Sequence, residues 1–223
     1  MSRAVCLALA TMSSVFALAQ TRITELRFAP WWGEHALELG ATQHMADGSS
    51  VRIDRLRFYV GTPVVAGDSE AMLLPYTYHL VDASDSSTWR IACPRAIDHI
   101  LMGVDSLTNV SGVLGGDLDP TKGMYWAWNS GYINVKVEGT CSSSPYPKQE
   151  FELHLGGYLP PNATVQQIDL KGRGVGVVEV KVDVRAFLAQ VDLASRCNVM
   201  SPGAEAVRLS RAAATMFVFH AKH

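Results

Sequence analysis

Alternation of apolar and polar residues is the feature that most constrains the fold of this chain. Residues 178–184 read Val-Glu-Val-Lys-Val-Asp-Val, so an extended strand here has one apolar and one polar face. Segments of similar character lie at residues 23–28, 51–60, 76–81, 133–137 and 151–155, separated by residues that favour turns. The pattern predicts an all-β protein, an antiparallel β-sandwich in which each sheet buries one face.

Two short helices are expected near the C-terminal end of the sequence. They cover residues 185–193 and, after Ser201-Pro202-Gly203, residues 204–214. No internal repeat or linker divides the sequence. We therefore expect a single β-sandwich domain over residues 20–223.

The first 19 residues have the composition of an export signal. Arg3 precedes a mostly apolar run over residues 4–18, and Ala17-Leu18-Ala19 has the small-x-small pattern that signal peptidase cleaves. We predict a signal peptide over residues 1–19 and a mature chain that begins at Gln20, in the periplasm or outside the cell. An uncleaved anchor is the alternative, but the apolar run is short for a membrane span.

Charge and cysteine content narrow the function classes. The formal net charge is −2 and basic residues are scattered, unlike a nucleic-acid-binding surface. Beyond residue 19, no segment is long and apolar enough to span a membrane. Cys93, Cys141 and Cys197 lack Cys-x-x-Cys spacing. In an oxidising compartment we expect two of them to pair, and the sequence leaves open which two.

The long segment 103–139 interrupts the alternation and is where we expect a site. The sequence contains no nucleophile elbow, His-Glu-x-x-His or P-loop motif, so we expect binding rather than catalysis. Loops of this length in a compact domain are often functional. Asp105, Asp117 and Asp119 in this segment are candidate calcium ligands, although solvated aspartates in turns are the alternative interpretation.

Two histidines lie within segments that resemble strands. His154 points away from the core if Leu153 and Leu155 point toward it, and His79 lies opposite Tyr78 and Leu80 by the same argument. Imidazoles held by strands are well-oriented ligands for copper or zinc. We predict His154 as a metal ligand and His79 as the second one, with His35 in reserve. Whether they converge depends on the strand order, which the sequence does not give.

Trp126 and Trp128 place two indoles on one face of a strand. If that strand continues without a bulge, they share a face with Tyr132 and Asn134, opposite Ile133. Both tryptophans then lie away from the main core, unless a bulge at residues 129–131 reverses this. An aromatic cluster at one end of the sandwich, or a sugar-binding platform, is the alternative interpretation.

Six segments together resemble the MbnP-like family and span nearly the whole mature chain. They are Gly103-Val104-Asp105-Ser106; Gly116-Asp117-Leu118-Asp119-Pro120; Gly123-Met124-Tyr125-Trp126-Ala127-Trp128 with Ser130-Gly131-Tyr132-Ile133-Asn134; Leu56-Arg57-Phe58-Tyr59-Val60; Phe151-x-Leu153-His154-Leu155-Gly156-Gly157; and Val199-Met200-Ser201-Pro202-Gly203.

The resemblance implies a β-sandwich, copper binding and a partner. The family is named from methanobactin gene cassettes and is related in kind to the secreted copper proteins MopE and CorA. The implied partner is a di-haem enzyme resembling cytochrome c peroxidases, which oxidises a tryptophan to kynurenine. Trp126 and Trp128 are the candidates for this modification. The aryl amine of kynurenine beside imidazoles suits copper, including Cu(I).

Two functions of different class therefore remain open. The first is an exported copper-binding protein that serves copper acquisition or storage. The second is a non-metal β-sandwich module that binds glycan or protein through its tryptophan-rich loop.

Overall fold

Fourteen β-strands are the main elements of the computed structural model, which describes residues 23–63, 76–93, 97–112, 114–129, 131–170 and 176–220. The expected signal peptide, residues 1–19, lies outside the described residues. No helix in the described part of the chain is long and apolar enough to cross a membrane.

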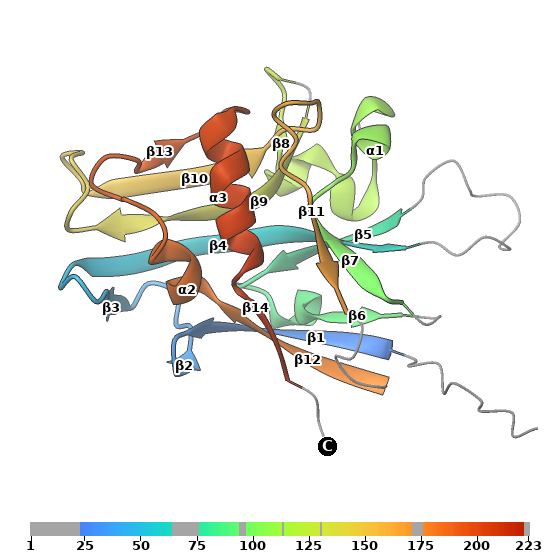
Figure 1. Ribbon diagram of the computed structural model, residues 1–223, viewed down its shortest axis with the longest axis horizontal. Helices are drawn as coiled ribbons and strands as arrows, with labels where there is room; N and C mark the ends of the chain where they lie inside the picture. Colours follow the sequence, from blue (N-terminus) through green and yellow to red (C-terminus); the bar gives the residue numbers. More distant parts are fainter. Residues whose placement is uncertain are drawn as a thin grey trace, which may run out of the picture.

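The strands form two sheets that face each other (Figure 1). The smaller sheet has the order β14 (Phe217–His220), β12 (Gly176–Asp183), β1 (Ile23–Trp32) and β2 (His35–Ala36), and β6 (Arg90–Ala92) also pairs with β1. The larger sheet has the order β11 (Gln166–Asp169), β7 (His99–Met102), β4 (Ser50–Pro63), β9 (Gly131–Cys141), β10 (Glu150–Gly156) and β13 (Asn198–Val199). Off this path, β3 (Thr42–His44) and β5 (Tyr76–Asp82) pair with β4, and β8 (Tyr125–Trp126) pairs with β9.

The predicted β-sandwich is confirmed, although it is not purely antiparallel. β1 and β12 run parallel, as do β10 and β13. Neither pair is joined by a hairpin, so no tight turn forces the two strands to run in opposite directions. Five of the six strand segments predicted from alternation lie wholly in strands, namely β1, β4, β5, β9 and β10. The sixth, residues 178–184, lies in β12 except for Val184, which begins α2 (Val184–Leu188).

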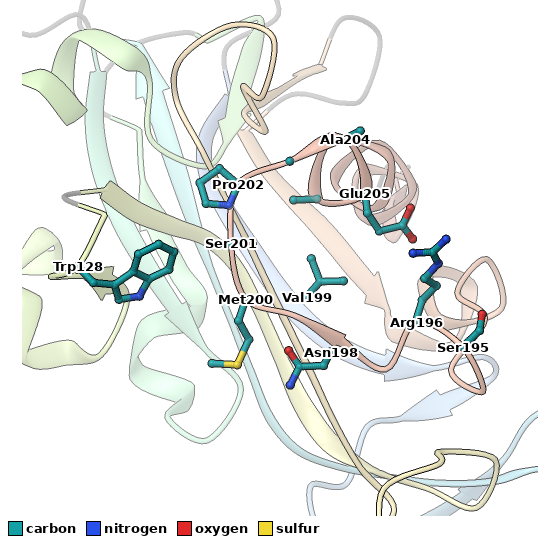
Figure 2. Close-up of a pocket in the computed structure, with 12 residues that line it drawn as sticks. Trp128, Ser195, Arg196, Asn198, Val199, Met200, Ser201, Pro202, Ala204 and Glu205 are labelled. Carbon is teal, nitrogen blue, oxygen red and sulfur yellow. The ribbon is translucent and has the colours of Figure 1, made fainter.

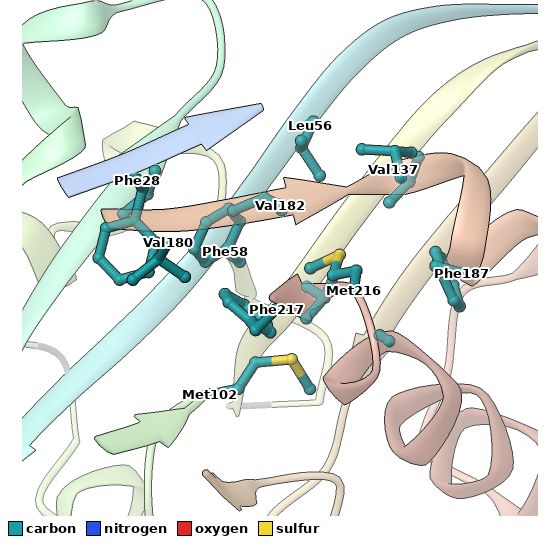
Figure 3. Packing of buried hydrophobic residues seen from close by; sticks show 14 of the residues in the cluster. Phe28, Leu56, Phe58, Met102, Val137, Val180, Val182, Phe187, Met216 and Phe217 are labelled. Atoms are coloured by element: carbon teal, nitrogen blue, oxygen red, sulfur yellow. The ribbon is translucent and has the colours of Figure 1, made fainter. Parts of the chain in front are cut away.

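The main core lies between the two sheets (Figure 3). Phe58 of β4 makes edge-to-face contacts with Phe28 of β1 and Phe217 of β14, with ring centroids 5.8 and 5.3 Å apart. Alternation explains this packing, because each strand turns every second side chain toward the opposite sheet. The apolar residues of β12, including Val180, are fully buried in the same cluster.

Three α-helices and three 3₁₀ helices complete the described elements. The α-helices are α1 (Ser106–Val110), α2 (Val184–Leu188) and α3 (Ala204–Ala214), and the 3₁₀ helices are η1 (Ser86–Trp89), η2 (Gly116–Leu118) and η3 (Pro120–Lys122). The predicted bounds of α3 are confirmed. The helix expected over residues 185–193 ends instead at Leu188, because Asp192 accepts hydrogen bonds from Ala194 N and Ser195 Oγ and begins a turn.

The three described cysteines are buried and unpaired. Cys93, Cys141 and Cys197 all lie in the main core as free thiols. The expected disulfide between two of them is therefore not formed. Burial raises the pKa of Cys93 to about 11, which keeps that thiol protonated and unreactive at neutral pH.

A second cluster of buried residues covers part of the outer face of the larger sheet. It contains Tyr59 and Leu80 from the sheet, and Met124, Trp126 and Leu118 from the long segment that folds over it. The segment between β7 and β9 thus supplies its own small core. This outer layer positions the candidate site.

Candidate functional site

A row of charged side chains crosses the outer face of the larger sheet. His154 on β10 pairs with Lys136 on β9. Lys136 pairs in turn with Arg57 on β4, and Arg57 with Asp82 on β5. The residues that flank this row along each strand are apolar and belong to the main core or the outer cluster. The sequence prediction that His154 points away from the core is therefore confirmed.

His154 is held by a carboxylate. Its side chain is buried, and Nε2 lies 2.7 Å from Glu138 Oε1. Arg55 donates to the other oxygen of Glu138 at 2.6 Å, and Lys136 Nζ lies 3.8 Å from Oε1. The hydrogen bond with His154, together with the nearby cations, lowers the pKa of Glu138. Glu138 is therefore an anion that fixes the orientation of the imidazole.

A carboxylate bound to one ring nitrogen is the arrangement seen behind many metal-ligating histidines. The carboxylate sets the tautomer and makes the second nitrogen a better ligand. Here Nε2 faces Glu138, which leaves Nδ1 of His154 for a ligand. The chemistry of this residue thus suits a soft or borderline metal ion.

The segment over the outer face is fastened by two cations of the row. Lys136 Nζ donates to the carbonyl oxygen of Gly123 at 2.6 Å, and Arg57 donates to that of Lys122 at 2.9 Å. Burial lowers the pKa of Lys136. Since both carbonyls belong to residues directly before Met124, these bonds fix the start of the segment that carries the tryptophans.

Trp126 packs on Gly156 of β10, two residues from His154. A Cβ atom built on Gly156 would be 2.7 Å from Cζ3 and 2.9 Å from Cη2 of Trp126, so the benzene edge of the indole rests on this glycine. Gly156 and His154 are two residues apart on one strand and therefore share a face, about 7 Å apart along it. The structure thus places Trp126 two residues from His154 on one face of β10, whereas sequence reasoning placed them in separate motifs. The imidazole of His154 itself turns toward Glu138, which pairs with Glu152 and so lies on the side away from Gly156.

The indole N–H of Trp126 is buried without a partner. The side chain is 5% exposed, and Nε1 has no hydrogen-bond acceptor among the described residues. A buried donor left unpaired costs about 1–3 kcal/mol. Such a cost is often found where a site awaits a ligand or a chemical change.

Trp128 lies at the surface next to Trp126. It is 66% exposed, and the two ring centroids are 5.5 Å apart with the planes tilted by 40°. Figure 2 shows Trp128 across from Met200 and Pro202, on the wall of a groove of about 560 Å³. The prediction that both tryptophans lie away from the main core is confirmed.

Ile133 differs from its sequence prediction. It was expected to face the main core with Val135, but it lies in the outer cluster. A bulge explains the change, because Leu155 pairs with Val135 whereas Gly156 pairs with Ile133. Asn134 is the extra residue, and the alternation of β9 reverses there rather than at residues 129–131.

His79 and His154 are not brought together. His79 pairs with Val60, which lies in the main core cluster, so its side chain is on the inner face of the sheet, whereas His154 is on the outer face. Three strand spacings also separate the two strands, about 14 Å. Burial lowers the pKa of His79. His35 lies on β2 of the other sheet, where it is exposed with Nε2 3.1 Å from Gln43 Oε1.

The three candidate calcium ligands point to separate partners. Asp105 caps α1 and accepts a hydrogen bond from Tyr78, Asp117 binds Lys122 Nζ at 2.6 Å, and Asp119 caps η3. Burial opposes ionisation of Asp105, but the hydrogen bonds that it accepts outweigh this and lower its pKa. Across the described residues, no three His, Cys, Asp or Glu side chains lie together as a metal-binding group.

Sequence reasoning missed Glu138, Lys136 and Gly156. Lys136 lies in a predicted strand segment, and Glu138 and Gly156 each directly follow one. The importance of all three depends on which residues they face across the sheet. The alternation of β9 does not reveal that Glu138 contacts His154 of the next strand. A buried lysine within an apolar strand segment was the one available signal.

One comparison with known proteins identifies a family. A sequence model of the MbnP family matches residues 21–201. Among solved structures, the chain is similar to MbnP from Methylosinus trichosporium, with 15% identity, a TM-score of 0.47 and 82% of each chain covered. No curated protein matches the sequence.

Proposed function

Because the chain belongs to the MbnP family, we propose that it is an exported copper-binding protein whose copper site forms around His154 and an oxidised Trp126. Membership associates the chain with methanobactin cassettes and copper. In this proposal the protein serves copper acquisition or storage in the periplasm or outside the cell, and it binds its cargo without catalysing a reaction.

The observation that carries the proposal is the position of Trp126 two residues from His154 on the same face of β10. The indole rests on Gly156, at the next position of β10 on the same face as His154. Indole is a poor metal ligand, and the buried Nε1 of Trp126 has no partner in the described structure. Opening the ring to kynurenine replaces this unpaired donor with an aryl amine, a nitrogen ligand that copper accepts.

The proposed partner is a di-haem enzyme resembling cytochrome c peroxidases, which supplies the oxidation. Conversion of tryptophan to kynurenine adds about 4 Da to the chain. Intact-mass measurement and peptide mapping of protein from the native host would detect this change. An unmodified peptide containing Trp126 and Trp128 in protein that still binds copper would remove kynurenine from the proposal.

The copper site is tested by paired histidine substitutions in the modified protein. His154→Ala removes the proposed ligand, whereas His79→Ala removes an imidazole on the opposite face of the same sheet. Competition titration should show copper affinity at least tenfold weaker for His154→Ala, about 1.4 kcal/mol or more. The His79→Ala control should retain the wild-type affinity. Equal effects of the two changes would contradict a site at His154.

The exposed face of Trp128 favours a second candidate function. This indole forms one wall of a groove whose other residues include Asn198, Ser201 and Arg196, a combination suited to stacking and hydrogen bonding with a sugar. In that case Trp128→Ala would abolish glycan binding, and His154→Ala would leave it unchanged. Glycan arrays with both variants would distinguish this module from a copper protein.

A further inference from the structure

We propose that Trp128 is a surface electron relay, through which a one-electron oxidant at the protein surface oxidises the buried Trp126. The inference rests on the proposed oxidation of Trp126 and adds the route by which it occurs. It assigns to Trp128 a role that differs from that of its neighbour.

The two indoles differ in their access to solvent. Trp126 is 5% exposed and Trp128 is 66% exposed. A macromolecular oxidant can therefore contact the ring of Trp128 but not that of Trp126. The open groove beside Trp128 leaves its face accessible from outside (Figure 2).

The contact between the rings suits electron transfer. Their centroids are 5.5 Å apart and their planes are tilted by 40°, within the range of stacked and tilted aromatic pairs. Electron tunnelling weakens steeply with distance, so two rings in contact exchange an electron far faster than either ring reacts with water. When Trp128 loses an electron, Trp126 can therefore replace it with one of its own.

The relay step moves one electron and no atoms. The oxidant, a high-valent haem or another one-electron acceptor, takes an electron from Trp128 and is reduced. Trp126 then gives one electron to the Trp128 radical cation, which restores Trp128 and leaves the radical cation on Trp126. No bond forms or breaks and no proton moves, since Nε1 of Trp126 has no acceptor among the described residues.

Tyr59 and Tyr132 compete poorly with the tryptophan pair for oxidation. Tyr125 and Tyr132 are in ring contact at 5.0 Å, and Tyr132 also contacts Tyr59 at 5.8 Å. Oxidation of a phenol requires its proton to leave to a base. The hydroxyl of Tyr59 donates to the backbone carbonyl of Asp117, and that of Tyr132 accepts from the backbone N–H of Leu114. Neither of these two hydroxyls faces a carboxylate that would take its proton, so oxidation does not pass from the tryptophan pair to Tyr59 or Tyr132.

The relay is tested without copper or a haem partner. The unmodified mature chain is exposed to tris(bipyridine)ruthenium(III), generated by light with persulfate as the electron acceptor, at a dose that gives at most one oxidation per molecule. Peptide mapping then quantifies oxidised Trp126. Trp128→Phe should lower this yield at least tenfold, because phenylalanine is not oxidised under these conditions. Trp128→Tyr should lower it as well, because the oxidised phenol loses its proton to water and the neutral tyrosyl radical is too weak an oxidant to take an electron from Trp126.

A matched variant and an internal reference control the experiment. Trp89 is partly buried, and its Nε1 donates to the carbonyl oxygen of Asp82, away from the pair. Trp89→Phe should leave the yield at Trp126 unchanged, and oxidation of Trp89 in the other variants measures the dose that each received. A wild-type yield at Trp126 in Trp128→Phe or in Trp128→Tyr would overturn the relay.

The relay experiment and the copper titration test separate claims, so either one can fail without the other. Loss of the relay with copper affinity still dependent on His154 would refute only the role of Trp128. Conversely, a working relay in a protein that binds no copper would refute the copper site and leave the electron route in place.

Discussion

Replacing Gly156 with alanine should destabilise the protein by forcing Trp126 away from the sheet. The new Cβ would be 2.7 Å from Cζ3 of Trp126 and also 2.7 Å from the backbone oxygen of Tyr132. Favourable contacts between carbon atoms lie at about 3.5–4.0 Å. One obstacle is therefore a buried ring and the other is backbone in the adjacent strand, so neither moves at little cost.

The size of the expected loss in stability follows from the overpacking of a well-packed layer. Extra methyl groups in well-packed cores typically cost about 1–3 kcal/mol. Because Tyr132 O cannot rotate away, we expect Gly156→Ala to lower the free energy of unfolding by about 2–3 kcal/mol. For a domain of this size, this corresponds to a fall in Tm of about 5–10 °C.

Urea unfolding followed by far-UV circular dichroism measures this change, with Gly115→Ala as the control. Gly115 has an ordinary φ of −93°, and a Cβ there meets no atom within 4 Å. Its replacement should change stability by less than about 0.5 kcal/mol. A double-mutant cycle with Trp126→Leu should show a coupling of about 1 kcal/mol or more. A Gly156→Ala protein as stable as wild type, or zero coupling, would refute the packing of Trp126 on this glycine.

Three further predictions concern buried polar groups and thiols. Asn134→Ala should cost about 2–3 kcal/mol in urea unfolding, because it leaves the buried N–H of Val104 without its acceptor; a cost below about 0.5 kcal/mol would contradict this. The pKa of Glu138 is lowered in the folded state, so its contribution to stability is present above its ordinary value of 4.5 and is lost as pH falls through the folded value. Glu138→Gln should therefore flatten the fall in unfolding free energy between pH 5 and pH 3, and an unchanged pH profile would argue against the pair with His154. With a thiol reagent at neutral pH, the native protein should react slowly, and the unfolded mature protein should show three reactive thiols, those of Cys93, Cys141 and Cys197. A count of one reactive thiol in the unfolded protein would reveal a disulfide.

Alternation along the sequence predicted the strands of the core but not their arrangement. The segment at residues 178–184 and its counterparts lie in strands because burial of one face depends only on local order. The parallel pairing of β1 with β12 joins segments separated by most of the chain. Nothing local to either strand specifies this partner, and the same holds for the pairing of β10 with β13.

The candidate site was likewise predicted only in part: the face of one histidine followed from the sequence, but the spatial relation between residues on different strands did not. The face of His154 followed from its strand neighbours, and the structure confirms it. Its relation to His79 did not follow, because β4 and β9 lie between the two strands and the side chains point to opposite faces. Ile133 was misplaced for a related reason. A single extra residue at Asn134 reverses the alternation, and one Asn within an otherwise apolar strand segment does not by itself reveal a bulge.

The segments that carry the family resemblance meet in the outer layer rather than in the main core. Asn134 accepts from Val104 N and donates to Thr164 Oγ1, which ties β9 to the chain that follows β7 and to the chain before β11. Gly103 permits this contact, since its φ is +107° and a Cβ there would lie 2.4 Å from Cγ of Asn134.

The same layer sets the position of the tryptophans. Asn109 Oδ1 accepts from the backbone N–H of Tyr132, and its Nδ2 donates to the carbonyl of Val104. These buried hydrogen bonds join α1 to β9 next to the short β8 that carries Trp126. A shift of this layer would move the indole from Gly156 and from the neighbourhood of His154. The polar residues of the loop therefore hold Trp126 over Gly156, on the face of β10 that carries His154.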